Sequence, residues 1–377
     1  MTNRRTGPRT ARPMIVLSVV AFACTTLTSV TVAAAPAGAA SCNPLLQALR
    51  LCTMPPPPAP TPAPSAYISM EDGLPADINL DPAYAPAFSI PTEPSTDQPS
   101  TPSRPGAPCG GAAPVAEDGT PWICTFSDEF TGSSLNRSKW TPQLTAQTSF
   151  TSGSGTATTC YVDSPDNISV GGGALALTVR KEAAPISCPI GGTRFRTSYT
   201  AGGVSTMGNF SQAYGRFDVR AAFPDSVLRG LQSSLWLWPD NSLKYGPWPG
   251  SGEIDIAEYY TSRPGFVVPT LHYYATTERD PAKGINSTTD AFCHFDEPGK
   301  FHDYTLVWTP DLLSVYYDGT LCLFDHWKPA LMSAPAPFDS PFFLTLTAGI
   351  GIGANSYDAR RTELPSTTRV DYVRIYK

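Results

Sequence analysis

The segment that decides the fold is Trp248-Pro249-Gly250-Ser251-Gly252-Glu253-Ile254-Asp255-Ile256-Ala257-Glu258-Tyr259-Tyr260. On a helix, its three acidic residues would share no common face. On a β-strand, Glu253 and Asp255 point to one side and the isoleucines beside them to the other. Glu258 is out of phase by one residue, and a single β-bulge at Ile256-Ala257 returns it to the acidic side. The segment predicts a strand with one apolar face and one face carrying three carboxylates.

Such a strand face suits the chemistry of glycoside cleavage. A retaining glycosidase needs two carboxyl groups about 5 Å apart, one as nucleophile and the other as acid and then base. Acid clusters are more often solvated surfaces, and that alternative holds for an isolated motif. Here apolar residues separate the acids and aromatic residues flank them, while the spacing of an EF-hand calcium loop is absent. The pattern favours Glu253 and Glu258 as a reacting pair.

Residues 109–377 carry the pattern of many short strands. Apolar residues alternate with polar or small ones over 168–179, 210–224, 235–238, 304–308, 313–317 and 369–376, and Asp318-Gly319 is a typical hairpin turn. Helical periodicity is nearly absent. This region is long enough for one domain with a large core. The pattern predicts an all-β protein, either a β-sandwich or a jelly roll.

Tryptophans near the acids are candidates for binding sugar rings, whose C–H faces are apolar. Trp236 and Trp238 share one face of a predicted strand, and the leucines between them share the other. Trp248 precedes the acidic strand, and His272 lies in another alternating segment. We expect these four residues to bind substrate. The alternatives are that the tryptophans belong to the core and that the histidine is structural.

The chain divides into three regions. Residues 1–40 are typical of a signal peptide, with arginines before the apolar run Met14–Ala35 and a small-residue cleavage site at Ala37-Gly38-Ala39. The run is also long enough for an uncleaved membrane anchor. Residues 41–108 are proline-rich and indicate an extended linker. Residues 109–377 are the predicted catalytic domain, which we expect to be secreted and free of the membrane after signal removal.

The cysteines agree with export. Of the nine cysteines, Cys24 lies in the predicted signal, and eight remain. An even number in an oxidising compartment indicates disulfides. Eight cysteines permit many connectivities, and we expect sequential pairing because each pair closes a short loop. The expected pairs are Cys42–Cys52, Cys109–Cys124, Cys160–Cys188 and Cys293–Cys322.

Composition excludes other classes of function. The net charge is −6, and basic clusters that would bind nucleic acid are absent. No G-x-S-x-G sequence supports a serine hydrolase, and neither the cysteines nor the histidines have metal-site spacing. We therefore expect a polysaccharide partner, no nucleic acid, a monomer and no required cofactor.

Seven motifs together resemble glycoside hydrolase family 16, the laminarinase-like jelly rolls, in the family's order over about residues 122–377. They are Phe126-Ser127-Asp128-Glu129-Phe130, Tyr214-Gly215-Arg216-Phe217-Asp218-Val219-Arg220, Trp236-Leu237-Trp238-Pro239, the acidic segment, Leu271-His272-Tyr273, Phe301-His302-Asp303-Tyr304 and Val370-Asp371-Tyr372-Val373-Arg374-Ile375-Tyr376. The resemblance implies a concanavalin-like jelly-roll sandwich with a substrate cleft on its concave sheet. The E-x-D-x-x-E form is similar to the bulged branch of β-1,3-glucanases, agarases and carrageenases.

The resemblance also implies roles for individual residues. Glu253 is expected as the nucleophile and Glu258 as the acid/base, with Asp255 hydrogen-bonding Glu253 between them. Family members often hold a structural calcium ion, and the matching carboxylates here are Glu129 and Asp371. We expect calcium there to be structural, with oxygen ligands.

These observations lead to one principal function and four alternatives. The principal function is a secreted, retaining endo-β-glucanase that hydrolyses β-1,3 or mixed β-1,3/1,4 glucan by double displacement. An agarase-like galactan hydrolase or a transglycosylase would use the same acids. A lectin of the same fold would bind glycan without cutting it, and a structural cell-wall protein would rest on the proline-rich region alone.

Overall fold

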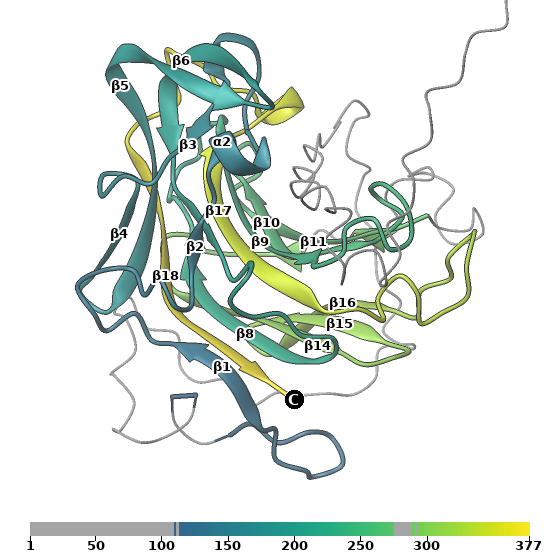
Figure 1. Cartoon of the computed structure of the whole chain (residues 1–377). Coiled ribbons are helices and arrows are strands. Elements are labelled where there is room, and N and C mark those ends of the chain that lie inside the picture. Colours follow the sequence, from purple (N-terminus) through teal and green to yellow (C-terminus); the bar gives the residue numbers. More distant parts are fainter. Residues whose placement is uncertain (1–108, 111–112, 275–288, 291–292) are drawn as a thin grey trace, which may run out of the picture. The chain divides into compact units, whose positions relative to one another are not determined.

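The computed structural model describes residues 109–110, 113–274, 289–290 and 293–377 (Figure 1). The predicted signal peptide, the predicted linker and the expected Cys42–Cys52 pair lie outside these residues. Within them, no helix is long and apolar enough to cross a membrane.

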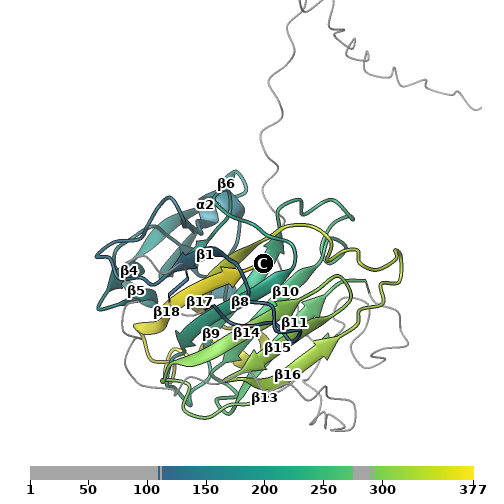
Figure 2. The same cartoon turned by 90° about the horizontal axis from the view of Figure 1, so that it is seen from below.

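Two mainly antiparallel β-sheets make up the described domain. The first sheet has the order β16 (Thr320–Asp325), β15 (Leu313–Tyr317), β14 (His302–Trp308), β8 (Gly215–Ala222), β18 (Ser366–Tyr376), β5 (Ala174–Ile190), β6 (Thr193–Ala201) and β3 (Cys160–Tyr161), with β1 (Cys124–Asp128) beside β18 and β4 (Ile168–Gly171) beside β5. Its central strands run side by side in the view of Figure 2.

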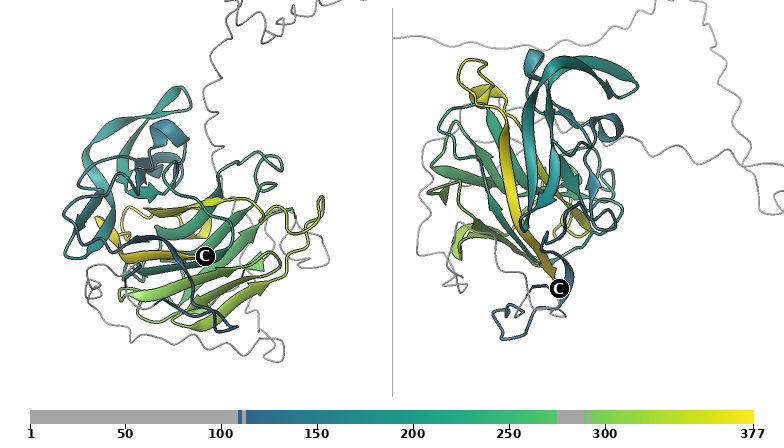
Figure 3. Two further views of the ribbon diagram at one scale, coloured as in Figure 1. Left: turned by 60° about the horizontal axis from the view of Figure 1, so that its bottom comes forward. Right: turned by 90° about the vertical axis from the view of Figure 1, so that its left-hand side faces the viewer.

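The second sheet carries the acidic segment at its centre. Its order is β12 (Thr289–Asp290), β11 (Phe266–His272), β10 (Glu253–Tyr260), β9 (Leu231–Pro239), β17 (Phe342–Ile350), β7 (Gly203–Ser205) and β2 (Thr141–Pro142), with β13 (Cys293–His294) beside β11. Helical structure in the described residues is limited to α2 (Thr145–Thr148), η2 (Gly155–Ala157) and η3 (Gly353–Asn355). The two sheets form a sandwich (Figure 3), which confirms the all-β prediction.

The core forms where apolar faces of the two sheets meet. Strand alternation sends every second side chain inward. Leu237, Ile254 and Ile256 enter this core from the second sheet, and Phe217 and Leu306 enter it from the first, all with no exposed surface. The opposite face of the second sheet, here called its outward face, is left for the acids.

Turn residues set the hairpins as the sequence predicts. Gly172 and Gly173 join β4 to β5 with φ of 63° and 83°, and Asp318 and Gly319 join β15 to β16 with φ of 47° and 75°. Positive φ at both central positions is the requirement of a tight hairpin turn, which Gly and Asp-Gly meet at low cost.

Three of the expected disulfides are present, Cys109–Cys124, Cys160–Cys188 and Cys293–Cys322. The Cys160–Cys188 bond ties β3 to the long β5–β6 hairpin at the top of Figure 1. The sequence does not predict the outer half of β5, because prolines and charged residues interrupt its alternation.

Candidate active site

Strand β10 contains the predicted bulge. Against β11, Asp255 pairs with Thr270 and Glu258 with Val268, so three steps on β10 face two on its neighbour. Against β9 the register also shifts between Asp255 and Ala257. The extra residue brings Glu258 back into phase with Glu253 and Asp255. All three acids therefore lie on the outward face, while Ile254 and Ile256 lie in the core.

Glu253 lies beside an indole and a second acid. Its side chain is 2% exposed, and Trp248 Nε1 donates a hydrogen bond of 2.7 Å to Glu253 Oε2. Trp248 precedes the strand, and its ring centroid lies 5.3 Å from that of His272 on β11. The indole fixes one oxygen of Glu253 and leaves the other without a described hydrogen bond.

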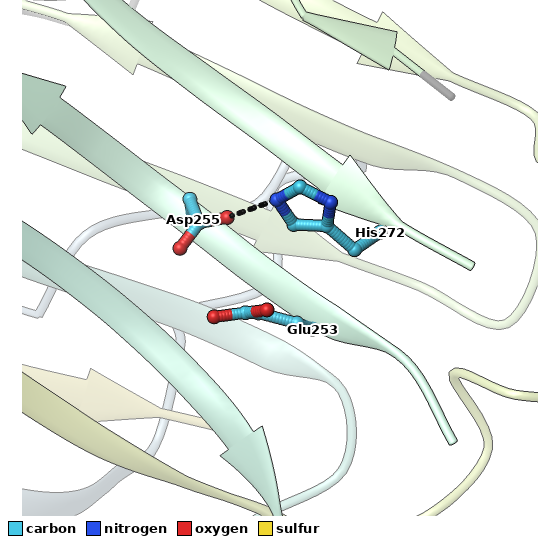
Figure 4. A group of neighbouring side chains, drawn as sticks. All are labelled: Glu253, Asp255 and His272. Carbon is cyan, nitrogen blue, oxygen red and sulfur yellow. Dashed lines mark ion pairs between the residues drawn. The ribbon is translucent and has the colours of Figure 1, made fainter. Parts of the chain in front are cut away.

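Asp255 pairs with His272, as Figure 4 shows. Asp255 Oδ2 and His272 Nε2 are 3.2 Å apart, and both side chains are buried. Among the described residues, no hydrogen bond joins Asp255 to Glu253, although their ligand atoms and that of His272 lie within 4.8 Å of one another. The expected hydrogen bond to Glu253 is replaced by the pairing with His272.

Glu258 is held at both oxygens. The Tyr260 hydroxyl donates to Glu258 Oε1 at 2.6 Å, and Thr270 Oγ1 donates to Glu258 Oε2 at 3.2 Å. Gln232 Nε2 lies 3.5 Å from Oε1. Sequence reasoning missed Tyr260, Thr270 and Gln232. These three side chains lie on the outward face because of the bulge in β10 and the register of β10 with β9 and β11.

Burial raises the pKa of all three carboxyl groups. Burial, and then the charge of Asp255, bring the pKa of Glu253 to about 8, against opposing effects of His272 and of the indole hydrogen bond. Burial and the nearby Glu258 raise the pKa of Asp255 well above its usual value. Burial raises the pKa of Glu258, opposed first by the hydrogen bond from Tyr260.

This electrostatic arrangement disfavours simultaneous ionisation of the three acids. Neighbouring buried carboxyl groups cannot all ionise near neutral pH, because each charge disfavours the next. Glycoside cleavage with retention needs this mixture, since one carboxylate must attack while one carboxylic acid donates a proton. The outward face can supply both forms on one strand.

The tryptophans occupy the expected side of the sheet. Leu235 and Leu237 lie in the main core, while Trp236 and Trp238 form a separate cluster with Phe343 on the outward face. Phe150 packs on this cluster, with its ring centroid 5.7 Å from that of Trp236.

The aromatic rings with the most exposed surface differ in part from those that we expected to bind substrate. Trp236 and Trp238 are only 6% and 5% exposed. Phe150 and Trp248 are half-buried and present more ring surface. Sequence reasoning missed Phe150, because it comes from a segment distant in the chain and carries no local signal.

The residues expected to hold calcium do not fit that role. Glu129 receives two hydrogen bonds from Arg374, at 3.0 and 2.9 Å. Asp371 lies 3.1 Å from Arg220 Nε and is 1% exposed. Arginine already neutralises each carboxylate and would repel a dication. The calcium prediction for Glu129 and Asp371 is therefore corrected to two arginine–carboxylate pairs.

One other group of side chains has the composition of a metal site. Within the described ranges, Glu253, Asp255 and His272 are the only three potential ligands gathered closely enough. This group contains Glu253, the expected nucleophile, and the ion pair of Asp255 with His272.

Comparisons with known proteins agree with this geometry. The model of glycosyl hydrolases family 16 matches residues 145–332. The laminarinase structure from Rhodothermus marinus is 30% identical, with a TM-score of 0.55, and the match covers 68% of this chain and 97% of that one. The chain belongs to glycosyl hydrolases family 16. This assignment confirms the resemblance seen in the motifs and identifies the fold as the family's jelly roll.

Two curated relatives extend the comparison. The glucan endo-1,3-beta-glucosidase A1 of Niallia circulans is 33% identical over 269 residues, which cover 67% of this chain and 37% of that protein. The keratan-sulfate endo-1,4-beta-galactosidase of Sphingobacterium multivorum is 32% identical over 184 residues, covering 48% and 40%. The chain thus spans about two fifths of the length of these two relatives.

Proposed function

We propose that this chain is a retaining endo-β-glucanase that hydrolyses β-1,3 or mixed β-1,3/1,4 glucan. The observation that carries the proposal is the bulged strand with Glu253, Asp255 and Glu258 together on the outward face. The β-1,3 linkage is supported by the laminarinase and endo-1,3-beta-glucosidase names of similar proteins.

In the first step of this mechanism, Glu253 is the nucleophile. Its free carboxylate oxygen forms a bond to the anomeric carbon while the glycosidic C–O bond breaks. Glu258 transfers its proton to the departing glycosidic oxygen. The products are a glycosyl ester on Glu253, a shortened glucan with a new hydroxyl, and an ionised Glu258.

In the second step, water hydrolyses the ester. Ionised Glu258 takes a proton from water as the water oxygen bonds to the anomeric carbon, and the ester bond to Glu253 breaks. Esterification removes the charge of Glu253, which favours ionised Glu258 as a base. Two inversions at one carbon give net retention.

The neighbouring groups prepare these steps. The Trp248 indole holds Glu253 Oε2 in place, so the other oxygen is the attacking atom. The pair of Asp255 and His272 lies beside Glu253. Negative charge on the ionised nucleophile Glu253 disfavours a second charge nearby and so helps Glu258 keep its proton before attack.

We also propose that the enzyme is exported and acts as a monomer outside the cell. The signal-like pattern of residues 1–40 supports export. The three disulfides of the described domain agree with an oxidising compartment.

A galactan hydrolase is the second candidate. It is favoured by the similarity to a keratan-sulfate endo-1,4-beta-galactosidase. The same three acids would serve either substrate, so the difference depends on the surfaces that bind the sugar rings.

The test is release of reducing sugar from laminarin, lichenan, agarose, carrageenan and xyloglucan by the wild type and by Glu253→Gln. We expect cleavage of laminarin that the substitution abolishes without loss of glucan binding. Cleavage of a galactan alone would keep the mechanism and change the substrate. Glycan binding without cleavage of any polymer would overturn the proposal in favour of a lectin.

A further inference from the structure

Strand β10 continues past Glu258 to a second group on the outward face, Tyr260. The side chain of Tyr260 is 5% exposed, and its hydroxyl makes the 2.6 Å hydrogen bond to Glu258 Oε1. Gln232 on β9 is the register partner of Tyr260 and approaches the same oxygen. Thr270 on β11 donates to the other oxygen. The two oxygens of Glu258 therefore have different donors, and the shortest contact is the one from the phenol.

Few titratable groups act on Glu258. They are Glu253, Asp255 and Tyr260 on β10, His272 on β11 and Tyr317 on β15. Of these titratable groups, the Tyr260 hydroxyl is the only one in the described residues that makes a direct hydrogen bond to Glu258. Tyr317 lies on the core side, where its hydroxyl donates to the carbonyl of Ile256.

Tyr260 remains a hydrogen-bond donor at every working pH. Burial and the charge of Glu258 raise the pKa of Tyr260 well above that of a free tyrosine. A threonine hydroxyl can rotate between donating and accepting, and Thr270 can therefore follow a change in protonation at Oε2. An amide N–H can only donate, and a phenol is a better donor and a poorer acceptor than an aliphatic hydroxyl, so Gln232 and Tyr260 at Oε1 favour an unprotonated oxygen more strongly than Thr270 does at Oε2.

Resting on the proposed retaining mechanism, we propose that Tyr260 is a positioning residue that selects the oxygen of Glu258 from which the proton is delivered. A phenol that donates to Oε1 leaves Oε2 to carry the proton. In the first step this proton moves from Oε2 to the glycosidic oxygen, as the glycosidic bond breaks and the Glu253 ester forms. In the second step Oε2 takes a proton from the attacking water as the ester breaks.

The hydrogen bond gains strength when Glu258 ionises. A bond from a neutral phenol to a carboxylate is charge-assisted and stronger than one to a carboxylic acid. Tyr260 therefore favours release of the proton in the first step. Without its hydroxyl, Glu258 would retain the proton to higher pH and release it more slowly.

The test compares Tyr260→Phe with the wild type on whichever polysaccharide of the panel the wild type cleaves. We expect the basic limb of the kcat/KM profile to move upward by about one pH unit. We also expect kcat to fall several-fold while KM changes less than twofold. A dinitrophenyl glycoside, whose leaving group needs no proton, should show a smaller defect than the polysaccharide.

Tyr259→Phe is the matched control. Tyr259 is the preceding residue on the same strand, but it points into the core, and its hydroxyl has no hydrogen-bond partner in the described part of the chain. Its pH profile should superimpose on that of the wild type.

The outcomes separate the two proposals. An active wild type whose basic limb does not move in Tyr260→Phe would overturn the role of Tyr260 alone. The same holds if only the melting temperature falls, since that result indicates a structural role. A wild type that cleaves no polymer would overturn both this inference and the proposed function.

Discussion

Both sheets bury carboxylates, but only the first supplies them with arginines. The pairs on the first sheet are Arg216–Asp218, Arg220–Asp303, Arg220–Asp371 and Arg374–Glu129, with nitrogen–oxygen distances of 2.8 to 3.2 Å. On the second sheet, Glu253, Asp255 and Glu258 are 2 to 4% exposed. No lysine or arginine among the described residues forms an ion pair with these three acids, and Asp255 pairs with His272 instead.

The difference separates structural acids from acids suited to catalysis. A buried carboxylate costs several kcal/mol unless a cation or hydrogen bonds compensate it. The first sheet meets that cost with arginine ion pairs. The second sheet leaves the acids able to exchange protons, as a glycosidase requires. The burial of uncompensated acids therefore lowers stability at the proposed catalytic residues.

The largest expected contrast is in activity, between the same substitution on the two sheets. Glu253→Gln should lower kcat on laminarin by at least about 10³-fold, because an amide is not a nucleophile. Glu129→Gln should keep kcat within about twofold while it is folded, because the ion pair of Glu129 within the described residues is with Arg374, away from the three acids. Initial rates with circular dichroism as a folding check measure both. A folded but inactive Glu129→Gln would erase the distinction.

The next contrast is in stability. Arg220→Leu removes the cation beside Asp303 and Asp371, and Arg220 is 5% exposed. We expect a loss of about 3–5 kcal/mol in the free energy of unfolding. Arg137→Leu is the control, because the Arg137–Asp163 pair is exposed and such pairs contribute about 1 kcal/mol or less. Chemical denaturation of both variants measures the contrast, and equal losses would contradict it.

A smaller expected effect is the loss of folding stability that results from burying the acids of the second sheet. The pKa of Glu253 is raised from 4.5 to about 8, so between these values the folded state keeps a proton that the unfolded state releases. Stability therefore falls as pH rises through this window. Glu253→Gln cannot titrate, and it should exceed the wild type by about 1–3 kcal/mol near pH 8.

The pH dependence makes this prediction specific. The advantage of Glu253→Gln should shrink toward zero below pH 4.5, where the wild-type side chain is protonated in both states. Melting temperatures of the two proteins from pH 4 to pH 8 measure the difference. An advantage that does not change with pH would point to a packing effect instead.

The smallest expected effect is that of a chelator. Since arginines already hold Glu129 and Asp371, EDTA should leave the melting temperature unchanged within error. A decrease that calcium restores and magnesium does not would show that the first sheet uses a metal ion after all.

The sequence predicted features that depend on local pattern. Alternation around Glu253 specifies the strand, and the phase error at Glu258 specifies the bulge. The alternation of leucine and tryptophan in β9 places Trp236 and Trp238 on the outward face. Each of these inferences needs only neighbours along one strand.

Features that depend on the register between distant segments could not be predicted from the sequence. The pairing of Asp255 with His272 requires the register of β10 against β11. The calcium expectation did not take into account the arginines beside Glu129 and Asp371, which strand packing places there. Phe150 reaches Trp236 from a segment more than 80 residues upstream.

The most direct test of the catalytic role of the second sheet's acids is mass spectrometry of a trapped intermediate. The wild type would be incubated with the dinitrophenyl glycoside of a β-1,3-linked glucose disaccharide in which fluorine replaces the 2-hydroxyl of the reacting sugar. This compound forms the glycosyl ester, and the ester then hydrolyses slowly. We predict one added glycosyl group, located by peptide fragmentation on Glu253. A label on any other residue, or turnover with inversion and no label, would contradict the assignment.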